Sequence, residues 1–134
     1  MLYVLMAVLS LHVLSAVFWT GTSFALARMG GLGGVRLFRP QMGAALVAVI
    51  TGGYLWSQLH AGSFGAPERV LAFGAACAVI AAGVQGRFGG MAIRALRRGN
   101  LTDVQVQPRI AMGQRIASPL LAVTVICMVI SRYV

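Results

Sequence analysis

Four long apolar stretches divide the chain, and each approaches the roughly 20 residues that an α-helix needs to cross a bilayer. They cover about residues 2–27, 40–58, 70–96 and 110–131, the third being most apolar in its first half. Arginine, glycine and short polar residues fill the connections between them. The pattern predicts an all-α integral membrane protein with a single four-span domain over residues 1–134.

Short connections make consecutive spans antiparallel neighbours, so we expect an up-down four-helix bundle. The first span begins at the initial methionine with no basic region and no small-residue cleavage site, and we interpret it as a retained span rather than a signal peptide. Pro40 and Pro67 suit the first turns of the second and third spans, where a missing N–H leaves no hydrogen bond unmade.

Composition supports a membrane protein over a soluble one. Hydrophobic residues make up 59% of the 134 residues and charged residues only 10%, whereas a soluble domain averages about 25% charged residues. The net charge of +9 comes entirely from arginines, which lie mainly between the apolar stretches. This distribution fits the positive-inside rule better than a nucleic-acid-binding face. The glycines of "MGGLGGVR" lack a phosphate-binding lysine and a strand–helix context, which excludes a nucleotide site.

The arginines also predict an orientation. Most of them lie in or next to the first and third connections: Arg28, Arg36, Arg39, Arg87, Arg94, Arg97, Arg98 and Arg109. The second connection holds only Arg69, beside Glu68. We therefore expect a bacterial inner-membrane protein with the first and third connections in the cytoplasm and both termini outside.

One imidazole, His12, lies in the middle of the apolar run "LHVLSAVFWTGTSFALA". An ionisable side chain inside a span is a functional-site hypothesis by default. Counting from the outer end places His12 about 15 Å deep. The residues expected at the same depth on the other spans are Thr51, Gly52, Cys77 and Thr124. On its own span, His12 shares one helical stripe with Ser15, Trp19 and Ser23, which we expect to face the bundle interior.

Three roles for His12 remain open. It can bind haem iron or copper, because imidazole is the commonest metal ligand and its neutral form suits a dry site. It can instead bridge two helices through a hydrogen bond worth about 0.6 to 2 kcal/mol. It can also relay protons.

The other soft ligands are weaker candidates. Met6, Met128 and His60 all fall in the outer half under the predicted topology, and Cu(I) favours thioether and imidazole ligands. His60 lies in the second connection, where an exposed histidine is more often solvated. Cys77 and Cys127 show no C-x-x-C spacing, so we expect them to pack rather than to form a zinc site or a redox motif.

Several of these segments resemble a known family. The first span "LHVLSAVFWTG", with His12, Trp19 and Gly21, is similar to the first span of CopD-like copper-resistance membrane domains and of the related HemJ-type haem-binding proteins. The segments "RPQMGAALVAVITGGYL" and "GAPERVLAFGAACAVIAAGVQGRF" resemble the next two spans of that family. In this resemblance Arg69 stands near the family's third-span lysine, and Arg87 stands near its terminal arginine.

The resemblance implies a four-helix bundle in which His12 serves a haem b or copper site. Gly52, Trp19 and Arg69 would then help to bind the cofactor, with Gly52, Gly53 and Gly74 allowing its close approach. His12, His60, Met6 and Met128 would be the metal ligands. The alternative is a non-catalytic accessory or scaffold subunit of a larger membrane complex or homo-oligomer, packed through glycine and alanine faces. Whether the chain is an enzyme stays open.

Overall fold

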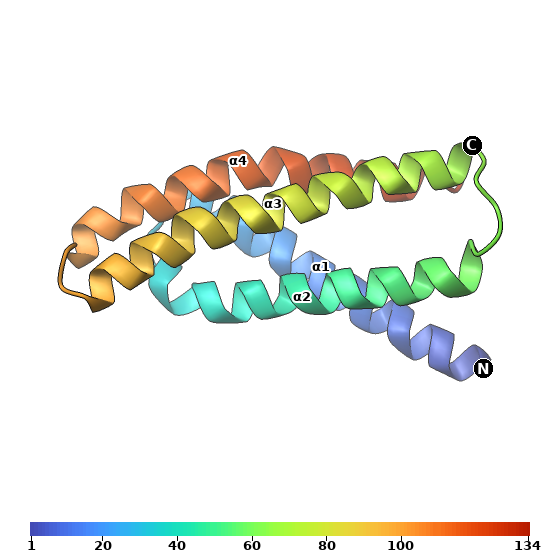
Figure 1. The fold of residues 1–134 in the computed structure, drawn as a ribbon, viewed down its shortest axis with the longest axis horizontal. Coiled ribbons are helices and arrows are strands. Elements are labelled where there is room, and N and C mark those ends of the chain that lie inside the picture. Colours follow the sequence, from blue (N-terminus) through green and yellow to red (C-terminus); the bar gives the residue numbers. More distant parts are fainter.

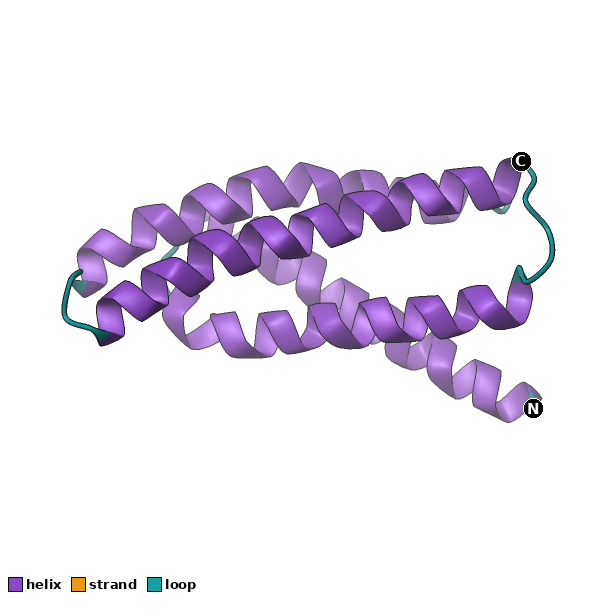
Figure 2. Ribbon diagram, in the orientation of Figure 1, coloured by secondary structure: helices purple, strands orange, loops and turns teal.

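A computed structural model describes all 134 residues as four helices joined by short loops, without any strand (Figures 1 and 2). The helices are α1 (Leu2–Arg28), α2 (Gly34–Leu59), α3 (Ala66–Arg97) and α4 (Asp103–Ile130). All four are long and apolar enough to cross a membrane. This confirms the predicted all-α, four-helix membrane bundle.

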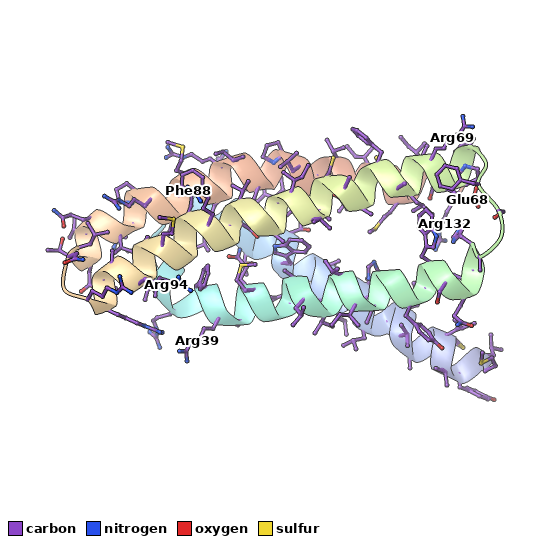
Figure 3. All side chains as sticks on the ribbon, viewed as in Figure 1. Arg39, Glu68, Arg69, Phe88, Arg94 and Arg132 are labelled. Atoms are coloured by element: carbon purple, nitrogen blue, oxygen red, sulfur yellow. The ribbon has the colours of Figure 1, made fainter.

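The helices alternate in direction, as predicted for an up-down bundle. Both termini and the α2–α3 loop lie at one end, and the α1–α2 and α3–α4 loops lie at the other (Figure 1). We call the end with the α1–α2 and α3–α4 loops the arginine-rich end. Figure 3 shows Arg39 and Arg94 near this end, whereas Arg69 and Arg132 lie at the opposite end beside Glu68.

Three helices begin earlier than the apolar spans suggested. α2 begins at residue 34 rather than 40, α3 at 66 rather than 70, and α4 at 103 rather than 110. Hydropathy finds only the apolar middle of a helix, and arginine and glutamine, which occupy these extra turns, are good helix formers. Thr102 caps α4 by accepting a hydrogen bond from the Gln105 backbone N–H, 3.3 Å away.

The expected role of Pro40 is therefore wrong, while that of Pro67 is confirmed. Pro67 lies in the first turn of α3, but Pro40 lies inside α2 because that helix already begins after Gly33. A proline there removes one backbone donor. Pro40 is exposed and near the arginine-rich end, so the Arg36 carbonyl that loses this donor is close to the polar boundary of the bundle.

Small residues bring the helices close together. α3 packs most extensively against α4, and α1 against α2, while α2 touches α3 over a much smaller area. A Cβ atom on Gly74 would lie 2.8 Å from the Cβ of Cys127, and one on Gly113 would lie 2.9 Å from the Cβ of Phe88. Glycines at these crossings allow close backbone approach, which is how helices associate within lipid.

Candidate functional site

The centre of the bundle holds three buried glutamines from three different helices. Gln41 of α2, Gln85 of α3 and Gln114 of α4 are 0%, 1% and 2% exposed. Trp19 and Ser23 of α1 complete what we call the glutamine cluster, and both are buried. Every one of the four helices therefore contributes to it.

Hydrogen bonds connect the members of the glutamine cluster. Gln85 accepts from Trp19 Nε1 at 2.6 Å and donates through Nε2 to Ser23 Oγ at 2.7 Å and to Gln114 Oε1 at 2.9 Å. Gln114 Nε2 donates to Gln41 Oε1 at 2.9 Å, and Gln41 Nε2 donates back to Gln114 Oε1 at 3.2 Å. Every amide nitrogen and oxygen of the three glutamines thus has a partner.

The glutamine cluster is suited to holding helices together rather than to chemistry. Glutamine amides do not titrate at physiological pH, and in lipid an unpaired amide costs several kcal/mol. A fully paired network therefore favours one register of the four helices over others. Sequence reasoning missed it. The available signal was a glutamine within each of the second, third and fourth apolar stretches.

His12 lies against α2, apart from the glutamine cluster. Its Nδ1 is 2.9 Å from the carbonyl oxygen of Ala48 and 3.0 Å from Thr51 Oγ1. The Thr51 hydroxyl itself donates to the Val47 carbonyl at 2.6 Å. Because a carbonyl oxygen can only accept, this network assigns the proton of a neutral His12 to Nδ1. The other ring nitrogen, Nε2, then keeps its lone pair and has no hydrogen-bond partner.

Gly52 makes room for the imidazole. A Cβ at this position would lie 3.1 Å from His12 Cε1, so the glycine lets the ring rest against α2. The predicted common depth of His12, Thr51 and Gly52 is thereby confirmed. On α1, Ser15, Trp19 and Ser23 are buried as the helical stripe predicted, and His12 at its end is half-buried.

The remaining predicted cofactor-binding residues lie elsewhere. Trp19 belongs to the glutamine cluster, and Arg69 is exposed at the start of α3. Gly53 faces open space, while Gly74 packs against Cys127 of α4. We expected Gly52, Gly53 and Gly74 to approach one flat cofactor together. The three glycines instead face different surroundings and do not line one common site.

The other predicted metal ligands lie on different elements toward the end of the bundle that holds both termini. Met6 is exposed, six residues before His12 on α1, and Met128 is half-buried near the end of α4. His60 follows the last residue of α2, with its ring centre 5.7 Å from that of Trp56 and its Nδ1 buried without a hydrogen-bond partner. No three His, Cys, Asp or Glu side chains gather closely enough to hold a metal ion together.

These contacts determine whether His12 can bind haem iron or a copper ion. A histidine that binds haem iron or copper needs a ring nitrogen with a free lone pair, and His12 Nε2 would provide one. The second ring nitrogen of a metal-ligating histidine usually donates to a carbonyl or carboxylate, as Nδ1 does here. The space left by Gly52 is filled by the imidazole itself. His12 thus fits the donor requirement as a single ligand.

No protein-family model, curated protein or solved structure matches this chain.

Proposed function

We propose that this chain is a small multi-pass membrane protein that binds b-type haem, or alternatively copper, through His12 Nε2, in a redox or metal-handling role. The observation that carries the proposal is the hydrogen bond from Nδ1 to the Ala48 carbonyl, 2.9 Å long. It fixes the tautomer that leaves Nε2 as a ligand. The resemblance of the first span to CopD-like and HemJ-type proteins points in the same direction.

The surrounding residues would act on the ligand rather than on a substrate. Ala48 and Thr51 hold the imidazole plane and its proton, and Gly52 sets how closely the ring approaches α2. A neutral imidazole suits a site within lipid, where a charged ring would be costly. Bound haem would supply one-electron chemistry, with its potential set by the axial ligand and by the dry surroundings.

His12→Ala should abolish bound haem or metal while leaving a folded, membrane-inserted protein, because one half-buried ring contributes little of the bundle's packing. His60→Ala is the matched control, and we expect it to lower binding only partly, since solvent can replace a side chain at the end of α2. The measurement is Soret absorbance and metal content after expression with iron, haem precursor and copper supplied. A colourless, copper-free wild-type protein from its native membrane would rule the proposal out.

A second candidate is a non-catalytic accessory subunit of a larger membrane complex. The contacts of His12 with two groups on α2 favour it, because they are those of a residue that bridges two helices. In this case the wild type carries no pigment, and His12→Ala costs at most about 1 kcal/mol of stability, in line with other hydrogen bonds in membranes. The same spectrum and metal analysis therefore distinguishes the two candidates.

We also propose that the arginine-rich end faces the cytoplasm of a bacterial inner membrane, with both termini outside. The arginines in and beside the α1–α2 and α3–α4 loops support this orientation. Reporter fusions after residues 30, 62 and 100 test it. We expect cytoplasmic activity at 30 and 100 and periplasmic activity at 62, and a cytoplasmic residue 62 would contradict the proposal.

A further inference from the structure

A groove of about 600 Å³ opens between α2 and α3 at the arginine-rich end. Four arginines with exposed side chains line it: Arg36 and Arg39 of α2, and Arg94 and Arg97 of α3. No acidic residue lines it. Figure 3 shows Arg39 and Arg94 on the two helices that border the groove. The groove therefore offers four positive charges to a negatively charged ligand.

A second, entirely apolar groove of about 280 Å³ continues between the same two helices. Six residues line it: Met42, Ala45, Leu46, Val49, Val79 and Ala82. On each helix the lining residues of the two grooves follow one another at intervals of three or four, so they occupy a single face. We call this combined surface, from Val35 to Val49 on α2 and from Arg97 to Val79 on α3, the α2–α3 seam.

The α2–α3 seam is charged at one end and apolar along the rest. From Val35 to Val49 it extends about 21 Å along α2, at 1.5 Å per residue. The hydrocarbon core of a bilayer is about 30 Å thick, so one leaflet contributes about 15 Å. The arginines would then lie at headgroup level while the apolar part runs through one leaflet.

Small side chains keep the α2–α3 seam open. Gly86 and Gly90 line the charged groove, and a Cβ on Gly86 would meet no atom within 4 Å. Phe38 of α2, which also lines the charged groove, comes closest to α3 at Gly89, where a Cβ would lie 2.6 Å from the ring. The limited contact between α2 and α3 elsewhere leaves room for a slender apolar chain.

We propose that the α2–α3 seam binds an anionic phospholipid, with its phosphate between the four arginines and one acyl chain against the apolar groove. Arginine binds phosphate oxygens through two parallel hydrogen bonds, which a lysine cannot match. Basic pockets between membrane helices are known to bind anionic lipid headgroups. The apolar continuation favours a lipid over free phosphate, which would use the arginines alone. This proposal is independent of any cofactor at His12.

Native mass spectrometry of the full-length protein, delipidated in detergent, tests the ligand class. We expect phosphatidylglycerol to bind at least tenfold more tightly than phosphatidylcholine of the same chain length. Inorganic phosphate at the same concentration should neither bind measurably nor displace the lipid. Equal affinity for the two lipids would overturn the proposal, and so would phosphate binding as tight as that of phosphatidylglycerol.

A charge-matched pair of double variants tests the position of the headgroup. Arg39→Gln with Arg94→Gln should weaken phosphatidylglycerol binding at least tenfold. Arg87→Gln with Arg109→Gln removes the same charge from exposed residues that do not line either groove, and it should change binding less than twofold. Equal losses in the two double variants would show attraction by net charge alone and would overturn the proposed site.

A leucine in the charged groove, about one helical turn from Ala82 of the apolar groove, tests whether the lipid occupies the α2–α3 seam without removing any arginine. Gly86→Leu should weaken phosphatidylglycerol binding at least fivefold, because the new side chain fills the groove. Gly83→Leu on the same helix is the control, since its Cβ also meets no atom within 4 Å and it lines neither groove. Unchanged binding by Gly86→Leu would overturn the placement of the lipid within the α2–α3 seam. If that variant does not fold, the arginine variants still decide the proposal.

Discussion

Gly31→Ala is expected to lower the free energy of unfolding by about 2 to 5 kcal/mol, the sum of a backbone conformational cost and a steric cost. Gly31 has a φ of +85°, a left-handed conformation that disfavours any residue with a Cβ. Its Cβ would also lie 2.1 Å from the backbone oxygen of Gln107 and 2.9 Å from the carbonyl carbon. Backbone atoms in the middle of a helix turn cannot move aside as a flexible side chain can. The loss is measured by reversible unfolding in detergent micelles.

Gly30→Ala separates the two costs. Gly30 also has a positive φ, +66°, but a Cβ there would meet no atom within 4 Å. We expect this control to lose only the conformational part, about 1 to 2 kcal/mol. Equal losses at Gly30 and Gly31 would contradict the close approach of the α1–α2 loop to α4.

Gln114→Leu is expected to destabilise the bundle by about 2 to 4 kcal/mol. The change removes three hydrogen bonds of the glutamine cluster and leaves Gln41 Oε1 without its donor. Leucine has a similar volume, so lost hydrogen bonding rather than a cavity should dominate the effect. Gln58→Leu, at an exposed position near the end of α2, is the control and should change stability by less than about 0.5 kcal/mol.

A double variant tests whether the side chains of Gln41 and Gln114 stabilise each other. Gln41→Leu combined with Gln114→Leu removes both members of a mutually hydrogen-bonded pair. Its loss should be smaller than the sum of the two single losses, because neither partner is then left unpaired. Additive losses would indicate that the two amides do not interact.

The apolar pattern was sufficient to predict the four helices and their alternating directions. It could not locate the first turns of α2, α3 and α4, because charged and amide side chains interrupt the apolar pattern there, although they are compatible with a helix. Depth counting correctly placed His12 beside Thr51 and Gly52. Depth counting also placed Cys77 and Thr124 at the level of His12, but neither forms a hydrogen bond with it. Thr124 Oγ1 instead donates to the Gly74 carbonyl at 2.9 Å.

The glutamine cluster and the α2–α3 seam could not be predicted from the sequence, for a different reason. Each depends on which helix faces meet, and residues such as Gln41, Gln85 and Gln114 are far apart along the chain with no periodic relation. A lone amide in an apolar span indicates a polar contact but does not identify its partner. Likewise, Arg39 and Arg94 become neighbours across a groove only once α2 and α3 are placed side by side.

The glutamine cluster has a consequence for how the protein is made. Gln41 and Gln85 leave the ribosome before Gln114, so for a time two amides lie within lipid without their full set of partners. The cluster can close only when α4, the last helix to be synthesised, takes its place. A chain that stops short of α4 would therefore leave Gln41 Oε1 without its hydrogen-bond donor inside the membrane, where an unpaired amide costs several kcal/mol.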